Sequence, residues 1–330
     1  MFYVKLIMVK IKMARKKKFK LKKKFRRLLL YIVILVIITM FGINRYNVYK
    51  YHQTNEYKLL EVGYDEKTVE ILLDKLNDKQ QGKLIETEKI DYILDIVNEK
   101  YFLQKNFEKY LEYYKENSKY SFSDIIAVVN VGADKEWYEE TQETDITKGY
   151  SILANKFNLL PEEFDAGVIK EFSATYAYGK VSAEETTYHA FIEMAKAAKE
   201  DGITLILTSG YRTREKQETL YNDMLKSRGQ TYADDYAARP GASEHETGLA
   251  LDILTYNGTT DTFETTETYA WLIAHCHEYG FILRYPKDKE HITGYKPESW
   301  HYRYVGVELA QKIKDEGITY DEYYAYYLDK

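Results

Sequence analysis

The chain of 330 residues contains a single cysteine, Cys276. No disulfide can form within it, and no zinc site built from several cysteines can exist. One cysteine does not distinguish a reducing compartment from the exterior of a cell that makes few disulfides. The shortage of cysteine therefore restricts the kind of metal site but leaves the location open.

Acidic residues are missing from residues 1–27, which carry thirteen Lys and Arg. The formal net charge of −5 therefore divides into +13 for this basic tail and −18 for residues 28–330. Such a negative body repels phosphates, so nucleic acid is not expected as a partner. Because 45% of all residues are hydrophobic, the body can bury a core and is not a disordered chain.

Charged residues are also absent from the sixteen residues Leu28–Ile43, which read LLLYIVILVIITMFGI. As a helix this run spans about 24 Å at about 1.5 Å per residue, slightly less than the hydrocarbon core of a bilayer. The Lys and Arg directly before it predict a cytoplasmic N-terminus, with the rest of the chain outside. A cleaved signal peptide is the alternative. The residues after Met40 make a poor cleavage site, so an uncleaved transmembrane anchor at 28–43 is favoured.

The sequence between this run and residue 150 has a mostly helical pattern. Residues 44–58 are polar and predict a short stalk, and apolar residues recur at helical spacing between residues 90 and 97. One short apolar run, Ile125–Val129, predicts a strand. No catalytic cluster stands out, so residues 44–150 are expected to form a stalk and a mostly helical accessory region.

Helices and strands are intermixed from residue 151 onward. Helices are expected at 183–199, 213–225 and 266–279, strands at 203–208, 248–254, 281–285 and 300–305, and a loop at 228–243. The connections between strands are not regular crossover helices. The expected fold of residues 151–330 is therefore α+β, with a mainly antiparallel central sheet flanked by helices. A helical region and one N-terminal transmembrane helix precede it.

Two of the seven histidines stand in segments rich in polar residues. His245 lies in SEHETGLALD, and His301 lies in PESWHYRY. The other five are expected to be ordinary. His275 and His277, for example, are two positions apart, and such residues do not face each other on a helix.

Two imidazoles, one carboxylate and a water make up a catalytic zinc site, and His245, Asp252 and His301 could supply the three side chains. If the chain were extended between them, His245 and Asp252 would lie about 23 Å apart, so a turn is required. Gly248 is the residue expected to make that turn. Glu298, three residues before His301, could act as general base. Taken alone, a His-x6-Asp spacing indicates a metal only weakly.

Four segments considered together carry more information. They are SGYRT at 209–213 with Gln217, GASEH at 241–245 continuing to Asp252, GFILRYP at 280–286, and ESWHYRYVG at 298–306. In this order and at these distances they resemble the VanY-type D-alanyl-D-alanine carboxypeptidases, in a family that also holds lysostaphin-like and Hedgehog-like zinc proteins. The resemblance covers roughly residues 150–312. The usual Glu-Pro-Trp-His of the family reads ESWH here, and the missing proline removes no ligand.

The resemblance implies that His245, Asp252 and His301 bind Zn2+. Zinc lowers the pKa of a bound water, and Glu298 would take the proton of that water and pass it to the leaving amine. Arg212 would be a second positive group beside the oxygen that becomes negative during the reaction. By the same resemblance, residues 151–330 would be a zinc carboxypeptidase domain.

Arg212, Gln217 and Ser243 resemble positions that contact substrate around its terminal carboxylate. The substrate would be a peptidoglycan stem peptide that loses its C-terminal D-alanine, so the domain would face outward from a bacterial cell membrane. An L,D-carboxypeptidase acting on tetrapeptide stems, an endopeptidase that cuts cross-bridges, and a non-catalytic cell-wall-binding module are the alternatives. The sequence does not predict an oligomeric state.

Overall fold

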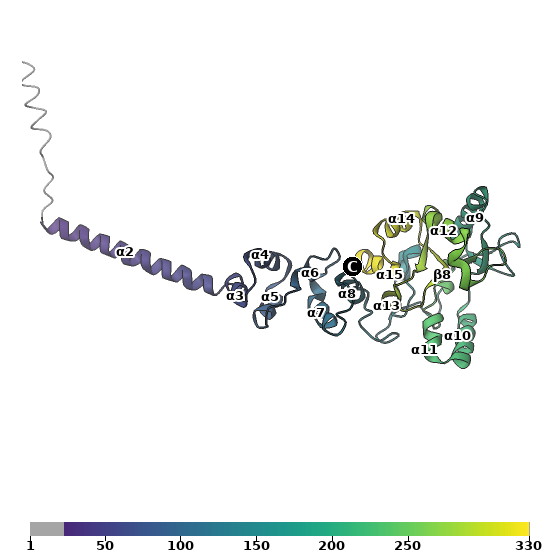
Figure 1. Cartoon of the computed structure of the whole chain (residues 1–330), viewed down its shortest axis with the longest axis horizontal. Helices are drawn as coiled ribbons and strands as arrows, with labels where there is room; N and C mark the ends of the chain where they lie inside the picture. Colours follow the sequence, from purple (N-terminus) through teal and green to yellow (C-terminus); the bar gives the residue numbers. More distant parts are fainter. Residues whose placement is uncertain (1–22, 330) are drawn as a thin grey trace, which may run out of the picture. The chain divides into compact units, whose positions relative to one another are not determined.

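The computed structural model describes residues 23–329, so residues 1–22 of the predicted basic tail lie outside the described residues. The chain forms two compact units, a first that ends at Asp91 and a second that begins at Tyr92. From residue 23 onward, the helices of the first unit are α2 (Lys23–His52), α3 (Asn55–Val62), α4 (Glu66–Lys75) and α5 (Asp78–Ile85), and Figure 1 labels them along the chain.

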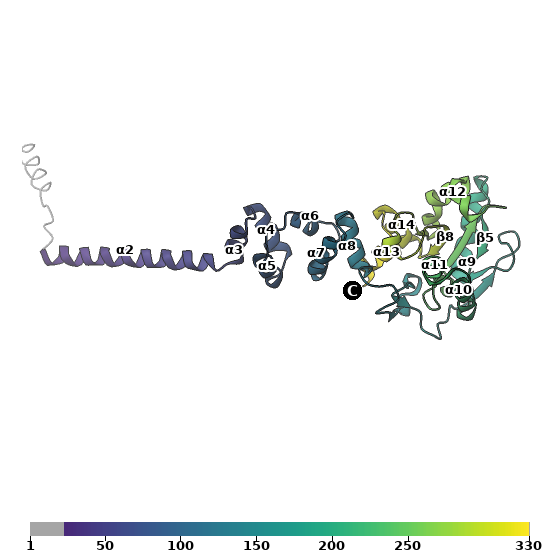
Figure 2. The same cartoon turned by 60° about the horizontal axis from the view of Figure 1, so that its bottom comes forward.

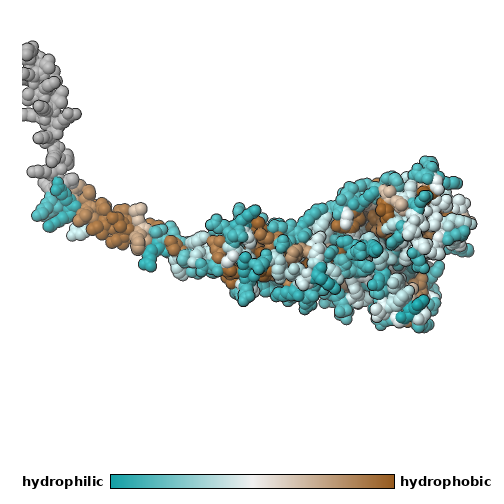
Figure 3. Space-filling view, viewed as in Figure 1, coloured by the Kyte–Doolittle hydropathy of each residue, from teal (hydrophilic) through white to brown (hydrophobic). Residues whose placement is uncertain are grey.

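Helix α2 contains the whole apolar run that starts at Leu28. None of its residues is buried against other parts of the protein, and Figure 3 shows the apolar surface along it. Within residues 23–329 it is the one helix long and apolar enough to cross a membrane. The prediction of a long apolar N-terminal helix is therefore confirmed, and both an anchor and a signal peptide have this form.

Helices α3, α4 and α5 are short, and they depend on caps and mutual packing rather than on length. Asn77 and Gln80 form a reciprocal capping box at the start of α5. Leu59, Leu72 and Leu84 are each at most 1% exposed, one from each helix, and provide a small core. The helical character expected for this region is present.

The second unit begins with three more helices, α6 (Ile93–Val97), α7 (Phe107–Glu116) and α8 (Phe122–Val131). The strand predicted at Ile125–Val129 is wrong, because these residues form the middle of α8. Ser121 caps the start of α8, and Gly132, with φ of 83°, ends it. All five apolar residues are buried. A short apolar run of this kind does not distinguish a strand from a helix that is covered on several sides.

A four-stranded sheet forms the centre of the second unit. Its order is β5 (Ile206–Ser209), β6 (Ala250–Leu254), β8 (Glu298–Tyr304) and β7 (Phe281–Tyr285), and all neighbours are antiparallel. The predicted α+β class with a mainly antiparallel sheet is confirmed. Two pairs of short strands lie outside it, β1 (Gln142–Glu143) with β2 (Asn158–Leu159) and β3 (Ile169–Glu171) with β4 (Ser182–Glu184).

The helices predicted at 183–199, 213–225 and 266–279 are confirmed as α9 (Glu185–Glu200), α10 (Arg214–Arg228) and α12 (Glu267–His275), the last continued by a 3-10 turn to Tyr279. The sequence analysis did not predict four further helices, α11 (Gln230–Tyr236), α13 (Glu290–Thr293), α14 (Val307–Glu316) and α15 (Tyr320–Tyr323). Figure 2 shows helices α9 to α14 around the sheet. The loop predicted at 228–243 is wrong over α11. Ala233 is fully buried in a cluster with Tyr221 of α10, so packing on its neighbour holds this short segment helical.

The sheet has one apolar face and one polar face because side chains alternate along a strand. Leu251, Ile253 and Tyr302 belong to the main core, together with residues of α9 and α12. The backbone register places Asp252 opposite His301 on β8 and also opposite Ser209 on β5. Facing residues of neighbouring strands project to the same side, so three polar side chains form a row across the sheet.

Candidate metal centre and active site

The three predicted ligands come together at this row. One donor atom from each of His245, Asp252 and His301 lies within 4.8 Å of the other two. Asp252 Oδ1 lies 3.5 Å from His245 Nε2 and 3.2 Å from His301 Nδ1. This buried oxygen accepts no hydrogen bond. Two imidazoles and a carboxylate that converge on one point, with an unsatisfied oxygen among them, fit a shared Zn2+ ion.

His245 lies in the loop before β6, and the backbone just after β5 orients its ring. Its Nδ1 lies 2.7 Å from the Gly210 carbonyl oxygen, which can only accept, so Nδ1 carries the proton and Nε2 is free to bind a metal. Gly248 makes the turn that was predicted, with φ of 72°. Gly210 also has to be glycine, because a Cβ there would lie 2.3 Å from the carbonyl oxygen of Ser182.

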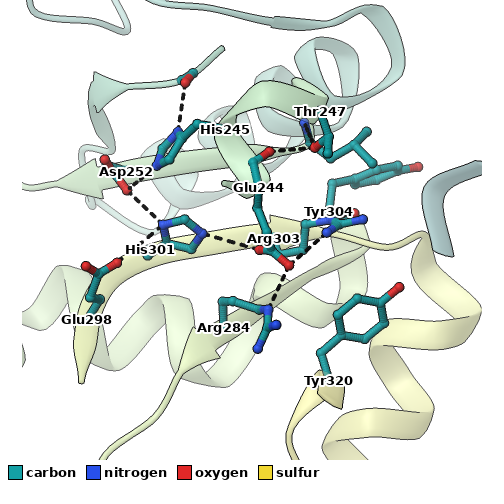
Figure 4. A network of polar contacts seen from close by, with 12 residues as sticks. Glu244, His245, Thr247, Asp252, Arg284, Glu298, His301, Arg303, Tyr304 and Tyr320 are labelled. Atoms are coloured by element: carbon teal, nitrogen blue, oxygen red, sulfur yellow. Dashed lines mark hydrogen bonds and ion pairs between the residues drawn. The ribbon is translucent and has the colours of Figure 1, made fainter. Parts of the chain in front are cut away.

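His301 is held from the opposite side by Glu244. His301 Nδ1 faces Asp252, and Nε2 lies 3.4 Å from Glu244 Oε2. Figure 4 shows Glu244 on the side of the His301 ring that faces away from Asp252. A carboxylate in this position fixes the ring and its tautomer, with Nε2 protonated and Nδ1 available to the metal.

Glu244 is itself held by two arginines that are 0% exposed. Its Oε1 accepts from Arg284 Nε at 2.7 Å and from Arg303 Nη1 at 2.8 Å. Arg284 also donates to Asp321 of α15, at 2.5 Å from Nη1. The sequence segments that suggested the site contain Glu244 and Arg284, but nothing in their spacing predicted this network.

Burial and neighbouring charges give the two histidines opposite pKa shifts. Burial and the nearby Arg212 charge lower the pKa of His245 to about 4, so it is a neutral ligand. Burial also lowers the pKa of His301, but Asp252 and Glu244 outweigh it and raise the value to about 9. Burial raises the pKa of Asp252, yet both histidines outweigh it and hold the value well below the usual range. A metal at this point would replace the proton on His301.

Glu298, the first residue of β8, faces the same point. Its Oε2 lies 3.5 Å from His301 Nδ1. Burial raises its pKa to about 7, and the negative charge of Asp252 acts in the same direction, while His301 and Arg212 oppose it. A carboxyl group with a raised pKa has the character of a general acid or base.

The structure also brings Arg212 and Gln217 to the centre. The Arg212 guanidinium donates to Ser209 Oγ at 2.8 Å, to Gln217 Oε1 at 3.1 Å and to Asp252 Oδ2 at 3.4 Å. The Gln217 amide donates to the Ala238 carbonyl oxygen at 2.8 Å. Gln217 therefore positions Arg212, and the direct substrate contact expected of Gln217 stays a prediction.

These groups line a cavity of about 240 Å³, and all seven predicted site residues belong to it. The sequence analysis did not assign a role to several other lining residues, namely Leu220, Met224, Tyr236, Glu244, Tyr285, Tyr295 and Trp300. Tyr285 and Trp300 lie inside the segments that resemble the family, and this position was the one sequence signal that could have assigned them to the site. The remaining five histidines, all within residues 23–329, do not line this cavity.

Cys276 does not contribute a nucleophile. The thiol is buried and unpaired, and burial raises its pKa to about 12. The thiolate is the reactive form, so this group stays an inert thiol near neutral pH. The chemistry of the second unit therefore centres on metal-binding and acid–base side chains.

Comparisons with known proteins agree with this site. The family model described as VanY, D-alanyl-D-alanine carboxypeptidase, matches residues 180–307. A D-alanyl-D-alanine carboxypeptidase of Enterococcus faecalis is 37% identical over 183 residues, which cover 52% of this chain and 64% of that protein. A D-alanyl-D-alanine carboxypeptidase of Enterococcus faecium is 30% identical over 242 residues, covering 70% of this chain and 74% of that one.

Two solved structures are also similar to this chain. The LdcB LD-carboxypeptidase is 31% identical with a TM-score of 0.54, covering 57% of this chain and 91% of that chain. A mutant of the D,D-pentapeptidase VanY from a VanB-type resistance cassette, solved in complex with Zn(II), is 36% identical with a TM-score of 0.46. The match covers 53% of this chain and 98% of that chain.

The second unit thus has the fold and the donor set of a metal-dependent peptidase. The chain belongs to the VanY D-alanyl-D-alanine carboxypeptidase family. Relatives in this family include both D,D- and L,D-carboxypeptidases.

The variant Glu244→Gln tests the buried network. Loss of its charge leaves Arg284 and Arg303 incompletely paired, and breaking a buried ion pair costs about 3–5 kcal/mol of unfolding free energy. Zn2+ affinity should also fall, by about 10- to 100-fold, because His301 loses its orienting partner. Denaturant unfolding followed by tryptophan fluorescence reports on the second unit, because all three tryptophans lie there.

The matched control is Glu308→Gln, which removes the exposed ion pair with Lys312. It should change the unfolding free energy by less than about 0.5 kcal/mol. If Glu244→Gln were as stable as this control and bound Zn2+ equally well, the buried network would not support the metal centre.

Proposed function

We propose that the protein is a membrane-anchored, zinc-dependent D,D-carboxypeptidase that removes the C-terminal D-alanine from peptidoglycan stem peptides. The observation that carries this proposal is the convergence of His245, Asp252 and His301, with Glu298 and Arg212 beside them, in one cavity. Family membership supports the choice of substrate.

In this proposal, bound Zn2+ would lower the pKa of a water molecule and polarise the scissile carbonyl. Glu298 takes a proton from the attacking water and later delivers it to the nitrogen of the leaving D-alanine. Arg212, held by Ser209 and Gln217, supplies a fixed positive charge to an anionic oxygen of the substrate. Ser243 lies in the wall of the cavity, and in this proposal its hydroxyl contacts the same end of the substrate.

An L,D-carboxypeptidase acting on tetrapeptide stems is the second candidate. The similarity to the LdcB LD-carboxypeptidase, which covers 91% of that chain, favours it. Both activities remove one terminal D-alanine and need the same metal, base and carboxylate-binding groups. They differ in the residue that precedes the scissile bond, so defined peptides separate them.

We further propose that residues 28–43 anchor the chain in the membrane, with the tail 1–27 in the cytoplasm and the zinc carboxypeptidase domain, residues 151–330, outside. The charge-free run and its basic flank support this orientation. Residues 44–150 would then be a stalk and accessory region that carries the domain toward the cell wall.

The activity can be measured on defined stem peptides. Full-length protein in detergent, loaded with Zn2+, should shorten a pentapeptide stem by one alanine, as seen by mass spectrometry. A chelator should abolish turnover, and added Zn2+ should restore it. Preferred cleavage of a tetrapeptide stem would support the L,D activity instead. Cleavage of cross-linked dimers would indicate an endopeptidase, and binding without turnover would indicate a cell-wall-binding module.

The variant Glu298→Gln tests the general base. Because Glu298 is not one of the three predicted ligands, the variant should keep one Zn2+ per chain while turnover falls by about 10²- to 10⁴-fold. Glu308→Gln, an exposed carboxylate on α14, is the control and should retain wild-type turnover. Wild-type turnover in Glu298→Gln would assign the proton transfer to another group.

Cell fractionation tests the anchor. The intact chain, including residues 1–27, should remain with bacterial membranes and be extracted by detergent but not by salt or alkali. Protease added to wall-free cells should digest the second unit. A released chain that lacks its first 40 or so residues would instead identify Leu28–Ile43 as part of a cleaved signal peptide.

A further inference from the structure

A shallow groove on the surface of α10 adjoins the cavity at the metal centre. Leu220 and Met224 line both the groove and the cavity. The other lining residues of the groove lie along one face of α10, with Tyr232 contributed by α11. Figure 2 shows α10 and α11 side by side. The two hollows therefore adjoin each other at Leu220 and Met224.

The wall of the cavity is exposed at Tyr236, next to this groove, and buried at Tyr285 and Tyr295. Tyr285 and Tyr295, which also line the cavity, are 6% and 4% exposed, whereas Tyr236 of α11 is 40% exposed. A carboxypeptidase holds the last residue of its substrate in the site, so the rest of the substrate chain has to leave by an open side. The exposed rim at Tyr236 is one such side.

An aromatic surface leads from the cavity into the groove. Tyr232 and Tyr236 are one helical turn apart on α11, and their rings stack with centroids 4.5 Å apart. Tyr236 lines the cavity, Tyr232 lines the groove, and each is 40% exposed. With Met224 beside them, they provide an apolar surface with polar edges, of the kind that binds extended peptides.

Helix α11 is held firmly, so this surface is formed before a ligand binds. Asp234 Oδ1 accepts from Tyr221 of α10 at 2.7 Å and from Arg239 Nε at 2.9 Å. Lys156 is 2% exposed, and its ammonium donates to the Asp234 carbonyl oxygen at 2.7 Å. A preformed surface loses little conformational entropy when it binds a ligand.

The groove is also more cationic than the protein around it. Lys216 and Arg228 line it, with Asp223 as the one acidic residue among its lining side chains. The Arg228 guanidinium lies 5.4 Å from the ring centre of Tyr232. Because residues 28–330 carry a net charge of −18, a positive local charge here favours an anionic segment of the substrate over the surrounding surface.

We propose that this groove is a binding subsite for the part of the stem peptide that precedes the scissile bond, with Tyr232 as its aromatic contact and Lys216 and Arg228 as its contacts to a carboxylate. The inference rests on the proposed function and extends it, because it gives the enzyme a reason to prefer a complete stem over a short peptide with the same end. Binding energy gained at a distance from the reacting bond raises kcat/KM for the longer substrate.

The test compares two substrates on the full-length, Zn2+-loaded protein in detergent. They are the acetylated tripeptide Lys-D-Ala-D-Ala and the complete stem L-Ala-D-isoglutamyl-L-Lys-D-Ala-D-Ala, whose second residue carries a carboxylate. The ratio of kcat/KM for the complete stem over the tripeptide should exceed one in the wild type. Tyr232→Ala, and the double variant Lys216→Gln with Arg228→Gln, should each lower this ratio by about 5- to 10-fold.

Two controls match these variants. Lys226→Gln removes an exposed cation of α10 that does not line the groove, and Tyr256→Ala removes a tyrosine that is 64% exposed elsewhere on the second unit. Both should keep the wild-type ratio. Equal kcat/KM for the two substrates in the wild type, or an unchanged ratio in the groove variants, would overturn the proposal.

A binding measurement separates this inference from the proposed function. The fragment L-Ala-D-isoglutamyl-L-Lys lacks the scissile bond, and its affinity can be measured by calorimetry even if no peptide is cleaved. Tyr232→Ala should weaken its binding by about 5- to 10-fold relative to Tyr256→Ala. No binding of this fragment, or Tyr232-dependent binding of a stem-free disaccharide in its place, would overturn the assignment to a peptide subsite.

Discussion

The pairing of β6 with β8 is the constraint on which the site depends. It places Asp252 opposite His301, and the next pairing places Ser209 opposite Asp252. A slip of one residue would turn these side chains toward the apolar core, so the packing of Leu251 and Tyr302 protects the register that the metal needs. Two ligands and the residue that holds Arg212 are thus positioned by backbone hydrogen bonds. His245 is the exception, since the turn at Gly248 brings it back over the sheet.

Charges of both signs are concentrated around this row. Burying Arg284 and Arg303 costs free energy, and their pairing with Glu244 and Asp321 offsets that cost. The network therefore fixes the position of His301 more than it adds to the free energy of unfolding. On the other side of His301, Asp252 and Glu298 add two more carboxyl groups. The excess of carboxyl groups at this point favours a divalent cation, while the arginines behind Glu244 keep the ligand histidine in place.

Much of this arrangement could be predicted from sequence, and the failures have physical causes. The ligands stand in short segments of distinctive composition, and Gly248 supplies the turn that their spacing requires. Residues 125–129 form a helix and not the predicted strand. The prediction failed because an apolar run that is buried on several sides has the same sequence pattern in a helix and in a strand. The network around Glu244 escaped prediction because its members come from β7, β8 and α15, and only the folded chain brings them together. The groove along α10 could not be predicted either, because residues 228–243, which include α11, were expected to be a loop.

The distribution of the ligands along the chain links metal binding to the completion of folding. His245 and Asp252 are seven residues apart, whereas His301 follows 49 residues later on a different strand. A chain in which β8 has not yet paired with β6 offers two ligands, and the third arrives with the last strand of the sheet. A bound ion would therefore add its binding free energy to that one strand pairing, because separating β6 from β8 must also release the ion. The metal would act as a clamp between strands in addition to its part in chemistry.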